Sequence, residues 1–476
     1  MNKIDKEIIE KLAVRVAELG GRAYLVGGAV RDEVMRRPIK DVDVEVHGIY
    51  ETVLEEVLKE LGKPLRFGSA FGVYSLAGHQ IDVALPRSER KSGAGHRDFE
   101  IEINPFIGIK EAARRRDFTM NALLKDILSG EITDPYGGVE DIRNRIIRHI
   151  DDKTFGEDPL RALRAAQFRS RFGFQIAPST ISICRALDLR ELSAERVEME
   201  MKKALLESHR PSEFFECLRE MGQLRYWFQE LEQLIGLEQN PKFHPEGDVW
   251  THSMMVLDRA AHFRSCVSDP YAFMLLALTH DFGKITTTEF VNGAIHAYGH
   301  EIQGAEIAER FLDRISHDSY MKRYIRNMIP NHMRPNIVAE ARSSIKKTNH
   351  MFDDVLAPVD LIYFAICDKP KLLYNMTLDE TDKELSESYK EMEKEKEQKR
   401  VNFLFDRLQV YKETMSKPYV TGKDLIDNGI EPGENFKEIL DYAHKLRLAG
   451  IPKDSALKQT LSYARKLSVK NINKAL

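Results

Sequence analysis

The feature that most constrains this chain is the run Leu-Val-Gly-Gly-Ala-Val-Arg-Asp at residues 25–32. Its apolar residues predict a strand that ends at Gly27 and Gly28, and Arg31 follows in a segment with helical character. Glycines at such a turn let a backbone approach phosphate oxygens, and a helix N-terminus favours their negative charge. The run therefore predicts a phosphate-binding corner, although an ordinary tight turn can have the same sequence.

Two acids follow at alternate positions of a β-branched run. Asp41 and Asp43 begin the segment Asp-Val-Asp-Val-Glu-Val at residues 41–46. Side chains alternate between the faces of a strand, so both carboxylates project from the same face. Their mutual repulsion is removed by divalent cations. Together with the glycine turn, this pair indicates a nucleoside triphosphate site with magnesium held by carboxylates.

A third acid lies inside a predicted hairpin whose strands cover residues 72–76 and 80–84. Asp82 stands between Ile81 and Val83. An acid in such a strand either faces solvent or belongs to a site. If the sheet places Asp82 beside the first pair, it can take a proton from an attacking hydroxyl group.

Composition limits the class of protein. The chain has 476 residues, enough for about three or four domains. Its formal net charge is −4, so a nucleic-acid ligand requires local basic patches. The four cysteines form no Cys-x-x-Cys pair, which fits a reducing compartment. No signal-like or membrane-spanning run is seen, so we expect a cytoplasmic protein with no membrane partner.

Two further segments of this part are basic. Residues 85–104 are rich in glycine and cations, which is typical of a mobile loop over an anionic substrate, although an ordinary solvated loop has the same composition. Residues 99–103, at the end of this segment, are expected to return as a strand. Three arginines at 114–116 then run into Asp117 and, at a short distance, Asn121. Guanidinium groups suit phosphate and ribose oxygens.

From Val139 onward the pattern is helical. Asp158 and Arg161 open one of these helices and lie three residues apart, hence on one face. An acid beside a guanidinium can pair with a donor and an acceptor on a base edge. A surface ion pair is the commoner outcome for this spacing.

Taken together, these motifs resemble those of the class II tRNA nucleotidyltransferases, which comprise bacterial CCA-adding enzymes and poly(A) polymerases. The resemblance covers five motifs in family order, at residues 25–43, 115–122, 134–138, 157–161 and 195–200. It implies template-independent addition of CCA to tRNA 3′ ends from CTP and ATP. It also implies that Asp41 and Asp43 hold two Mg²⁺ ions while Asp82 helps to activate the tRNA 3′-hydroxyl. The implied nucleotide-binding residues are Gly27, Gly28, Arg31, Arg116, Asp117, Asn121, Asp158, Arg161 and Arg164.

Within that family the product is decided by weaker signals. Residues 61–68 read Leu-Gly-Lys-Pro-Leu-Arg-Phe-Gly, a poor match to the basic segment of poly(A) polymerases. The loop at residues 85–104 is long, whereas enzymes that add only the two cytosines have a short one. Full CCA addition is therefore favoured. A poly(A) polymerase or an A-adding enzyme remains the alternative.

A second group of metal-ligating residues lies in the C-terminal half. His252, His280 and Asp281 resemble the motif of the His-Asp metal-dependent phosphohydrolases. The resemblance implies a divalent metal with Asp368 as the last ligand, for which Asp360 is the rival. His300 and His332 are candidates for a second ion, and phosphohydrolase activity on RNA ends is implied. The alternative is a helical domain retained only for packing.

The resulting prediction is an α+β chain with a small mixed-sheet head and a long helical remainder. We expect a nucleotidyltransferase head at 1–145, a helical neck with the nucleotide-selecting helix at 146–240, a His-Asp domain at 241–380, and a charged helix with a tRNA-binding tail at 381–476. The expected partners are tRNA, CTP and ATP. Two rival functions stay open: a catalytically silent RNA-binding protein, and a phosphohydrolase whose head only binds RNA. Seven tail cations suit tRNA phosphates: Lys437, Lys445, Arg447, Lys453, Lys458, Arg465 and Lys466.

Overall fold

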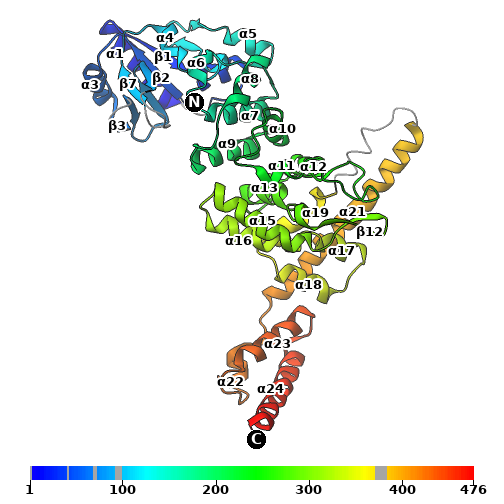
Figure 1. Ribbon diagram of the computed structural model, residues 1–476. Helices are drawn as coiled ribbons and strands as arrows, with labels where there is room; N and C mark the ends of the chain where they lie inside the picture. Colours follow the sequence, from blue (N-terminus) through cyan, green and yellow to red (C-terminus); the bar gives the residue numbers. More distant parts are fainter. Residues whose placement is uncertain (1–2, 40–41, 68–71, 92–98, 370–382, 476) are drawn as a thin grey trace. The chain divides into compact units, whose positions relative to one another are not determined.

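The computed structural model describes residues 3–39, 42–67, 72–91, 99–369 and 383–475. The chain divides into two units, Met1–Gln229 and Glu230–Leu476. Figure 1 shows the sheet of the first unit in blue and cyan, and the second unit as an array of helices in green, yellow and red. The predicted α+β class, with a small mixed sheet in the head and a helical remainder, is confirmed.

The first unit is a mixture of short strands and helices up to residue 126 and is mostly helical afterwards. In chain order they are α1 (Lys3–Glu18), β1 (Arg22–Val26), α2 (Gly28–Val34), β2 (Val42–His47), α3 (Glu51–Leu61), β3 (Pro64–Phe67), β4 (Val73–Leu76), β5 (Ile81–Ala84), β6 (Arg87–Lys91), β7 (Phe99–Ile103), α4 (Ile109–Arg114), η1 (Thr119–Asn121), β8 (Leu124–Asp126), β9 (Ile132–Thr133), α5 (Gly138–Arg143), β10 (Ile146–Ile147), α6 (Asp152–Phe155), α7 (Leu160–Phe172), β11 (Gln175–Ile176), α8 (Pro178–Ala186), α9 (Ala194–Glu207) and α10 (Ser212–Glu220). Helix α11 (Gln229–Glu232) spans the boundary between the units.

The main sheet has the strand order β3-β4-β5-β2-β1-β8-β9. Strands β2 and β5 run parallel, and the other neighbouring pairs are antiparallel. Apolar side chains of α1 and α3 form one core with the sheet, in which Val42, Val44 and Val83 are buried. Because side chains alternate along a strand, the residues between these valines face the opposite side of the sheet.

Residues 85–104 differ from the expected mobile loop. Strand β6 pairs antiparallel with β7, from Arg87↔Ile103 to Lys91↔Phe99, and residues 92–98 lie outside the described part. The alternation of apolar residues at 99, 101 and 103 has the period of a strand, which favours this pairing over a loop. The expectation of a loop was therefore wrong for Arg87–Lys91, whereas the strand expected at residues 99–103 is confirmed as β7.

The elements of the second unit are almost all helices. They are α12 (Val249–Ala261), η2 (Arg264–Cys266), α13 (Pro270–Thr279), α14 (Lys284–Thr287), β12 (Thr288–Val291), β13 (Ala294–Ala297), α15 (His300–Ile315), α16 (Ser319–Met328), η3 (Ile329–Asn331), α17 (Arg334–Glu340), α18 (Ile345–Asp353), α19 (Pro358–Cys367), α21 (Lys383–Ser416), α22 (Gly422–Ile426), α23 (Phe436–Leu448) and α24 (Lys453–Ala475). Helix α13 is at its centre, because every side chain from Tyr271 to Thr279 is buried. Within the described ranges, no helix has the length and apolar character needed to cross a bilayer.

One hairpin interrupts the helices of the second unit. Strands β12 and β13 pair antiparallel and are joined by Asn292 and Gly293, with φ angles of 51° and 81°. Asn-Gly is a preferred two-residue hairpin turn because both residues tolerate positive φ. The hairpin matters for function because His300, the first residue of α15, follows it closely.

Candidate active sites

Asp43 and Asp82 are direct neighbours in the head. They are register partners in the parallel β2–β5 pair, and both side chains are exposed on the face opposite the valine core. Neighbouring strands lie about 4.8 Å apart, so the two carboxylates are within reach of one shared cation. Asp41, the other acid predicted here, lies outside the described residues. Exposed carboxylate oxygens suit hard divalent cations such as Mg²⁺.

Gly27 forms the turn between β1 and α2. Its φ angle is 65°, and a Cβ atom built on it lies 2.8 Å from Nη1 of Arg116. Both the left-handed backbone and the approach of the guanidinium group therefore require glycine. Gly28 begins α2 immediately after this turn.

A chain of hydrogen bonds links four of the predicted nucleotide-binding residues. Arg31 donates to Asn121 Oδ1 at 2.8 Å, and the Asn121 amide donates to Asp117 Oδ1 at 2.8 Å. Arg164 donates to Asp117 Oδ2 at 2.7 Å and lies 3.8 Å from Glu200. Burial raises the pKa of Asp117, but the charge of Arg164 and the Asn121 hydrogen bond outweigh it, so the pKa falls below its usual range. The structure thus brings Arg31, Asn121, Asp117 and Arg164 into one network.

Asp158 and Arg161 do not bond to each other. Asp158 precedes α7 and accepts a hydrogen bond from Arg196 at 2.8 Å and another from the Leu160 N–H. Arg161 donates to the carbonyl oxygens of Thr154 and Arg115, at 2.6 and 2.7 Å. Both side chains are half-buried and held in fixed directions by these contacts.

Glu45 belongs to the head site and was not predicted. It is buried two residues beyond Asp43 on β2, bonds to His47 at 2.9 Å and lies 3.2 Å from Nη2 of Arg116. Burial raises the pKa of Glu45, but His47, Arg116 and Arg115 together lower it to about 2. Glu45 therefore anchors the guanidinium group that approaches Gly27. An acid in a predicted strand was the available signal, but its two arginine partners are 70 and 71 residues away in the chain.

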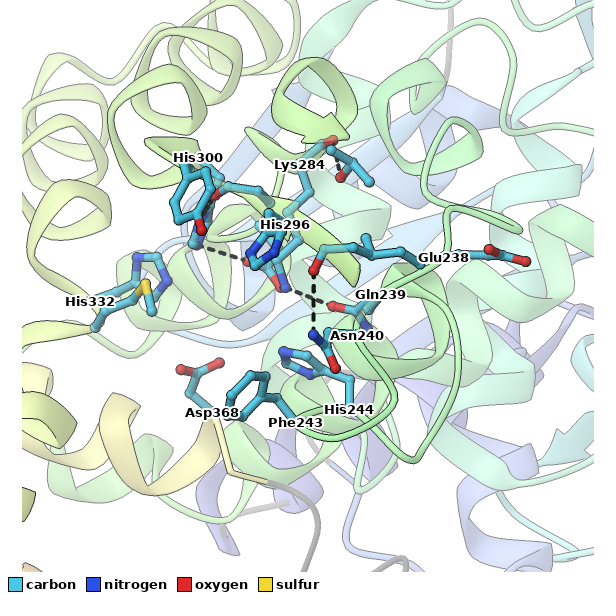
Figure 2. Close-up of a pocket in the computed structure, with 16 residues that line it drawn as sticks. Glu238, Gln239, Asn240, Phe243, His244, Lys284, His296, His300, His332 and Asp368 are labelled. Carbon is cyan, nitrogen blue, oxygen red and sulfur yellow. Dashed lines mark hydrogen bonds and ion pairs between the residues drawn. The ribbon is translucent and has the colours of Figure 1, made fainter. Parts of the chain in front are cut away.

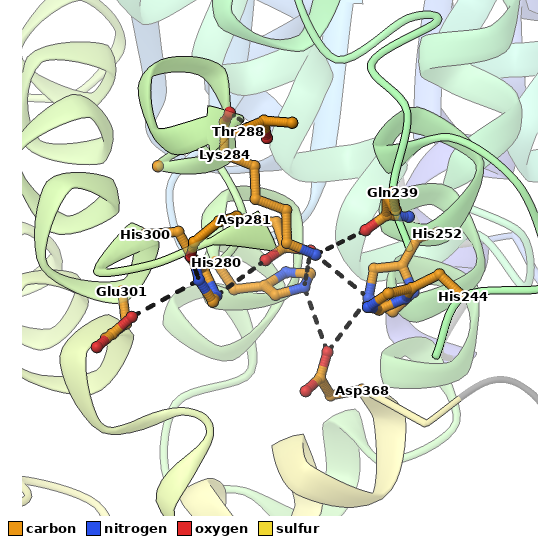
Figure 3. A network of polar contacts seen from close by, with 12 residues as sticks. Gln239, His244, His252, His280, Asp281, Lys284, Thr288, His300, Glu301 and Asp368 are labelled. Atoms are coloured by element: carbon orange, nitrogen blue, oxygen red, sulfur yellow. Dashed lines mark hydrogen bonds and ion pairs between the residues drawn. The ribbon is translucent and has the colours of Figure 1, made fainter. Parts of the chain in front are cut away.

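In the second unit, four predicted ligands meet at one point (Figure 3). His280 and Asp281 follow the C-terminal end of α13, His252 is on α12, and Asp368 follows α19. Nε2 of His280 lies 3.2 Å from Asp281 and 3.4 Å from Asp368, and Nε2 of His252 lies 3.3 Å from Asp368. Asp360, the alternative candidate for the last ligand, is not part of this cluster.

Asp360 is fully buried and has a structural environment. Its carboxylate accepts hydrogen bonds from Ser268 Oγ at 2.7 Å and from the Tyr324 hydroxyl at 2.8 Å. The geometry therefore favours Asp368 over Asp360 as a candidate ligand.

His300 and His332 form a second group of candidate ligands with Asp281. The structure places Asp281, His300 and His332 so that their ligand atoms are within 4.8 Å of one another. His300 Nε2 is 3.5 Å from Asp281 Oδ1. Two overlapping groups of three ligands thus share Asp281, the other being His252, His280 and Asp281.

The imidazole rings are oriented by their Nδ1 atoms. Nδ1 of His280, His300 and His332 lies 2.6–3.0 Å from a backbone carbonyl oxygen, and Nδ1 of His252 lies 2.7 Å from Glu246. A carbonyl oxygen or a carboxylate accepts from a protonated nitrogen, so each Nε2 is left to bind a metal ion. Glu246 was not predicted as a site residue, and its place before α12 gave no periodic signal.

The charges in this cluster are tightly coupled. Burial lowers the pKa of His280, but Asp281 and Asp368 outweigh it and raise it to about 10. Burial lowers the pKa of His332 to about 4. Nε2 of His280 makes no hydrogen bond of ordinary geometry with any residue in the described part of the chain. The cluster is a buried group of imidazole nitrogens and carboxylate oxygens, and Nε2 of His280 is at its centre. Such a group of ligand atoms fits a divalent metal ion.

A pocket of about 250 Å³ opens onto this cluster (Figure 2). Lys284, which was not predicted as a site residue, lines this pocket. Its ammonium group lies 2.8 Å from the Asp281 carboxylate and donates a hydrogen bond to Gln239 Oε1 at 2.6 Å. Its spacing of three residues from Asp281 was the only signal. A buried ammonium group beside the carboxylates gives the pocket affinity for an anion.

Comparisons with known proteins agree with this arrangement. Three family models match: the poly A polymerase head domain at residues 23–148, the probable RNA and SrmB-binding site of polymerase A at 173–235, and the HD domain at 249–409. The multifunctional CCA protein of Actinobacillus pleuropneumoniae serotype 5b is 37% identical over 327 residues, covering 67% of this chain and 77% of that protein.

Solved structures extend the similarity of fold to almost the whole chain. An apo form of a CCA-adding enzyme matches with a TM-score of 0.65 at 19% identity, covering 97% of this chain and 96% of the other. The Thermotoga maritima CCA-adding enzyme complexed with tRNA matches with a TM-score of 0.61 at 19% identity, over 96% and 95% of the two chains.

Proposed function

Since this chain belongs to the family of bacterial CCA-adding tRNA nucleotidyltransferases that carry an HD domain, we propose that it adds CCA to tRNA 3′ ends from CTP and ATP. The observation that carries the proposal is the placement of Asp43 beside Asp82, on the face of the sheet opposite the helix-covered core. The name of the Actinobacillus relative and the tRNA bound to the Thermotoga enzyme support the choice of product and substrate.

The head residues divide the reaction between them. Two Mg²⁺ ions bound at Asp41 and Asp43 would neutralise the triphosphate and favour ionisation of the attacking hydroxyl. Asp82 accepts the proton of the tRNA 3′-hydroxyl, whose oxygen bonds to the α-phosphorus as the bond to pyrophosphate breaks. The turn at Gly27 and Gly28 directs the N-terminus of α2 toward the phosphates.

Asp158 and Arg161 select the nucleotide in this proposal. Arg196 holds the carboxylate of Asp158, and two carbonyl oxygens hold the guanidinium group of Arg161. A fixed acceptor and a fixed donor can pair with the edges of cytosine and adenine without a nucleic-acid template. Arg164 lies on the same helix as Arg161, and its bond to Asp117, which also accepts from Asn121, holds it in place.

The test uses purified protein, tRNA lacking its last three nucleotides, and CTP and ATP given singly or together. We expect two cytidines with CTP alone and complete CCA with both. Tailing of any RNA with ATP alone would indicate a poly(A) polymerase, and adenosine addition only to tRNA ending in CC would indicate an A-adding enzyme. Unchanged incorporation by Asp41→Ala plus Asp43→Ala would contradict the assigned site.

A second activity is favoured by the cluster of His252, His280, Asp281 and Asp368 next to Lys284. We propose that it hydrolyses phosphate esters at RNA ends: a water oxygen bonds to phosphorus, the ester P–O bond breaks, and a proton goes to the leaving oxygen. A divalent metal held by these residues would activate the water. Lys284 holds the phosphate.

Variants of the two sites separate the rival functions. His280→Ala is expected to abolish hydrolysis of RNA ending in a phosphate and leave CCA addition intact, with Asp41→Ala plus Asp43→Ala giving the reverse. His262→Ala, an exposed histidine at the end of α12, is the matched control. A protein that loses its main activity only with His280→Ala is a phosphohydrolase with a non-catalytic head.

We also propose the finer division of the chain into a head at 1–145, a neck at 146–240, a His-Asp domain at 241–380 and a tail at 381–476. The HD family model reaches residue 409 and thus includes part of α21. Helices α23 and α24 would hold tRNA phosphates through the seven tail cations. Stronger loss of tRNA affinity with rising salt in the intact protein than in a variant lacking these charges would support this role.

A further inference from the structure

Three aromatic side chains line the mouth of the His-Asp pocket: Phe243, His296 and Tyr298, here called the aromatic platform. Tyr298 is 70% exposed and Phe243 is 65% exposed. The rings of His296 and Tyr298 are stacked, with centroids 4.9 Å apart and planes 10° from parallel. Figure 2 shows Phe243 and His296 beside the opening, where His332 and Asp368 also lie.

The platform is rigidly placed relative to the ligand cluster. His296 is on β13, within a paired hairpin closed by the Asn-Gly turn. The loop that carries Phe243 is joined to the hairpin because the Asn240 amide donates to the Ile295 carbonyl at 3.5 Å. Tyr298 is two residues before His300, and two residues of chain span at most about 7 Å. The backbone of Tyr298 therefore lies within about 7 Å of that of His300, a candidate ligand.

Exposed aromatic rings beside a pocket offer a flat apolar surface that a ligand can cover. A divalent ion held by the cluster would attract a phosphate, and Lys284 adds a positive charge to the same pocket. A molecule with an anionic phosphate at one end and a flat aromatic group at the other satisfies both parts. Nucleotides have this form, and bases stack on aromatic side chains with little dependence on sequence.

We propose that this pocket binds the terminal nucleotide of an RNA 3′ end, with its phosphate at the His-Asp cluster and its base stacked on the ring pair of Tyr298 and His296. This assignment rests on the proposed phosphohydrolase function and adds a base-binding subsite to it. Because stacking needs no hydrogen-bond readout, the four bases are accepted with similar affinity.

The experiment compares two five-nucleotide oligoadenylates that end in a 2′,3′-cyclic phosphate, one intact and one with an abasic terminal ribose. Tyr298→Leu removes the ring and keeps an apolar side chain. Tyr298→Phe keeps the ring and is the rescue variant. Phe290→Leu is the matched control, because Phe290 is 74% exposed on β12 of the same hairpin but does not line the pocket.

With the wild type, we expect the KM for the intact oligonucleotide to be about 5- to 150-fold lower than for the abasic one, the range given by base stacking. Tyr298→Leu should raise the KM of the intact substrate to that of the abasic substrate and leave kcat nearly unchanged. Tyr298→Phe and Phe290→Leu should behave as the wild type. Equal KM values for both substrates in the wild type, or an equal loss on both in Tyr298→Leu, would overturn the proposal.

If the wild type hydrolyses neither substrate, the phosphohydrolase function fails and the subsite is decided by binding. The dissociation constant of the intact oligonucleotide is then measured for each protein without turnover. The nucleotidyltransferase head contributes equally to all of them. Weaker binding by Tyr298→Leu alone supports the platform, and the same constant for all four proteins contradicts it.

Discussion

At the scale of single residues, Asp82 is the acid whose role follows most directly from its position. It is the register partner of Asp43 and faces away from the apolar core. We expect Asp82→Asn to slow CCA addition by about 10²–10⁴-fold, the usual contribution of a general base, with little change in CTP binding. Single-turnover rates on tRNA lacking its end measure this.

Glu131→Gln, which removes an exposed carboxylate from the same sheet region, serves as the control for Asp82. It should leave the rate unchanged. Full activity of Asp82→Asn would show that the proton goes to another group.

Glu45 gives a prediction on pH. Its folded-state pKa is about 2, below the ordinary value of 4.5 for glutamate, so the unfolded chain binds its proton more readily than the folded chain. The stability that Glu45 contributes is therefore present above pH 4.5 and lost as the pH falls toward 2. The melting temperature of Glu45→Gln should lie below that of the wild type at pH 7, and the gap should narrow through this window. A gap independent of pH would mean that packing, not charge, is responsible.

The same residues show what the sequence could predict. Alternation in residues 41–46 placed Asp43 on one face, but pairing of β2 with β5 depends on β3 and β4, which come between them in the chain. The sequence alone could therefore predict only that Asp82 joins the site if the sheet places it beside Asp43. Glu45 and Glu246 were missed because a buried acid is recognisable only by its partners, and these are distant in the chain or follow no repeat.

At the scale of elements, the turn between β1 and α2 depends on Gly27, which has a positive φ angle and lies close to the guanidinium group of Arg116. In Gly27→Ala, the alanine would have to adopt a φ angle of 65°, and its Cβ would lie 2.8 Å from Arg116. Gly78, in the β4–β5 hairpin, has a φ angle of 85° with open space around it. Each alanine should cost about 1–2 kcal/mol in the free energy of unfolding from the backbone alone.

Only Gly27→Ala should also reduce nucleotide addition, because it displaces the guanidinium group at the phosphate corner. Denaturant unfolding and CCA addition measured on both variants separate strain from function. Equal activities of Gly27→Ala and Gly78→Ala would contradict a role for this turn in binding phosphate.

Elements were predicted best where a period was clear. The strand that ends before Gly27 and the hairpin of β4 and β5 were predicted from apolar spacing, whereas β6 was missed because most of its residues are charged. The β12–β13 hairpin was missed although Asn292 and Gly293 give a strong turn signal, because each strand has only four residues and no clear alternation of apolar and polar side chains.

At the scale of the whole molecule, two units should unfold as separate cooperative transitions, as is usual for multidomain chains. The second unit contains the His-Asp cluster, and an ion that binds only the folded state stabilises it. At a free concentration one hundred times the dissociation constant, Mn²⁺ should add about 2.7 kcal/mol, which moves the midpoint of a unit of this size by roughly 5–11 °C. Scanning calorimetry with and without Mn²⁺ measures this shift.

His280→Ala decides which transition belongs to the metal site. Its shift is compared within the variant, with and without Mn²⁺, so a general loss of stability does not affect the result. We expect the Mn²⁺ shift of one transition to disappear in His280→Ala and to persist in His262→Ala, while the transition of the head stays at its midpoint in all three proteins. A shift that survives in His280→Ala would place the metal elsewhere, and a single transition would mean that the two units unfold as one. The first result would remove the metal basis of hydrolysis and leave the argument for Asp43 and Asp82 untouched, since those acids lie in the other unit.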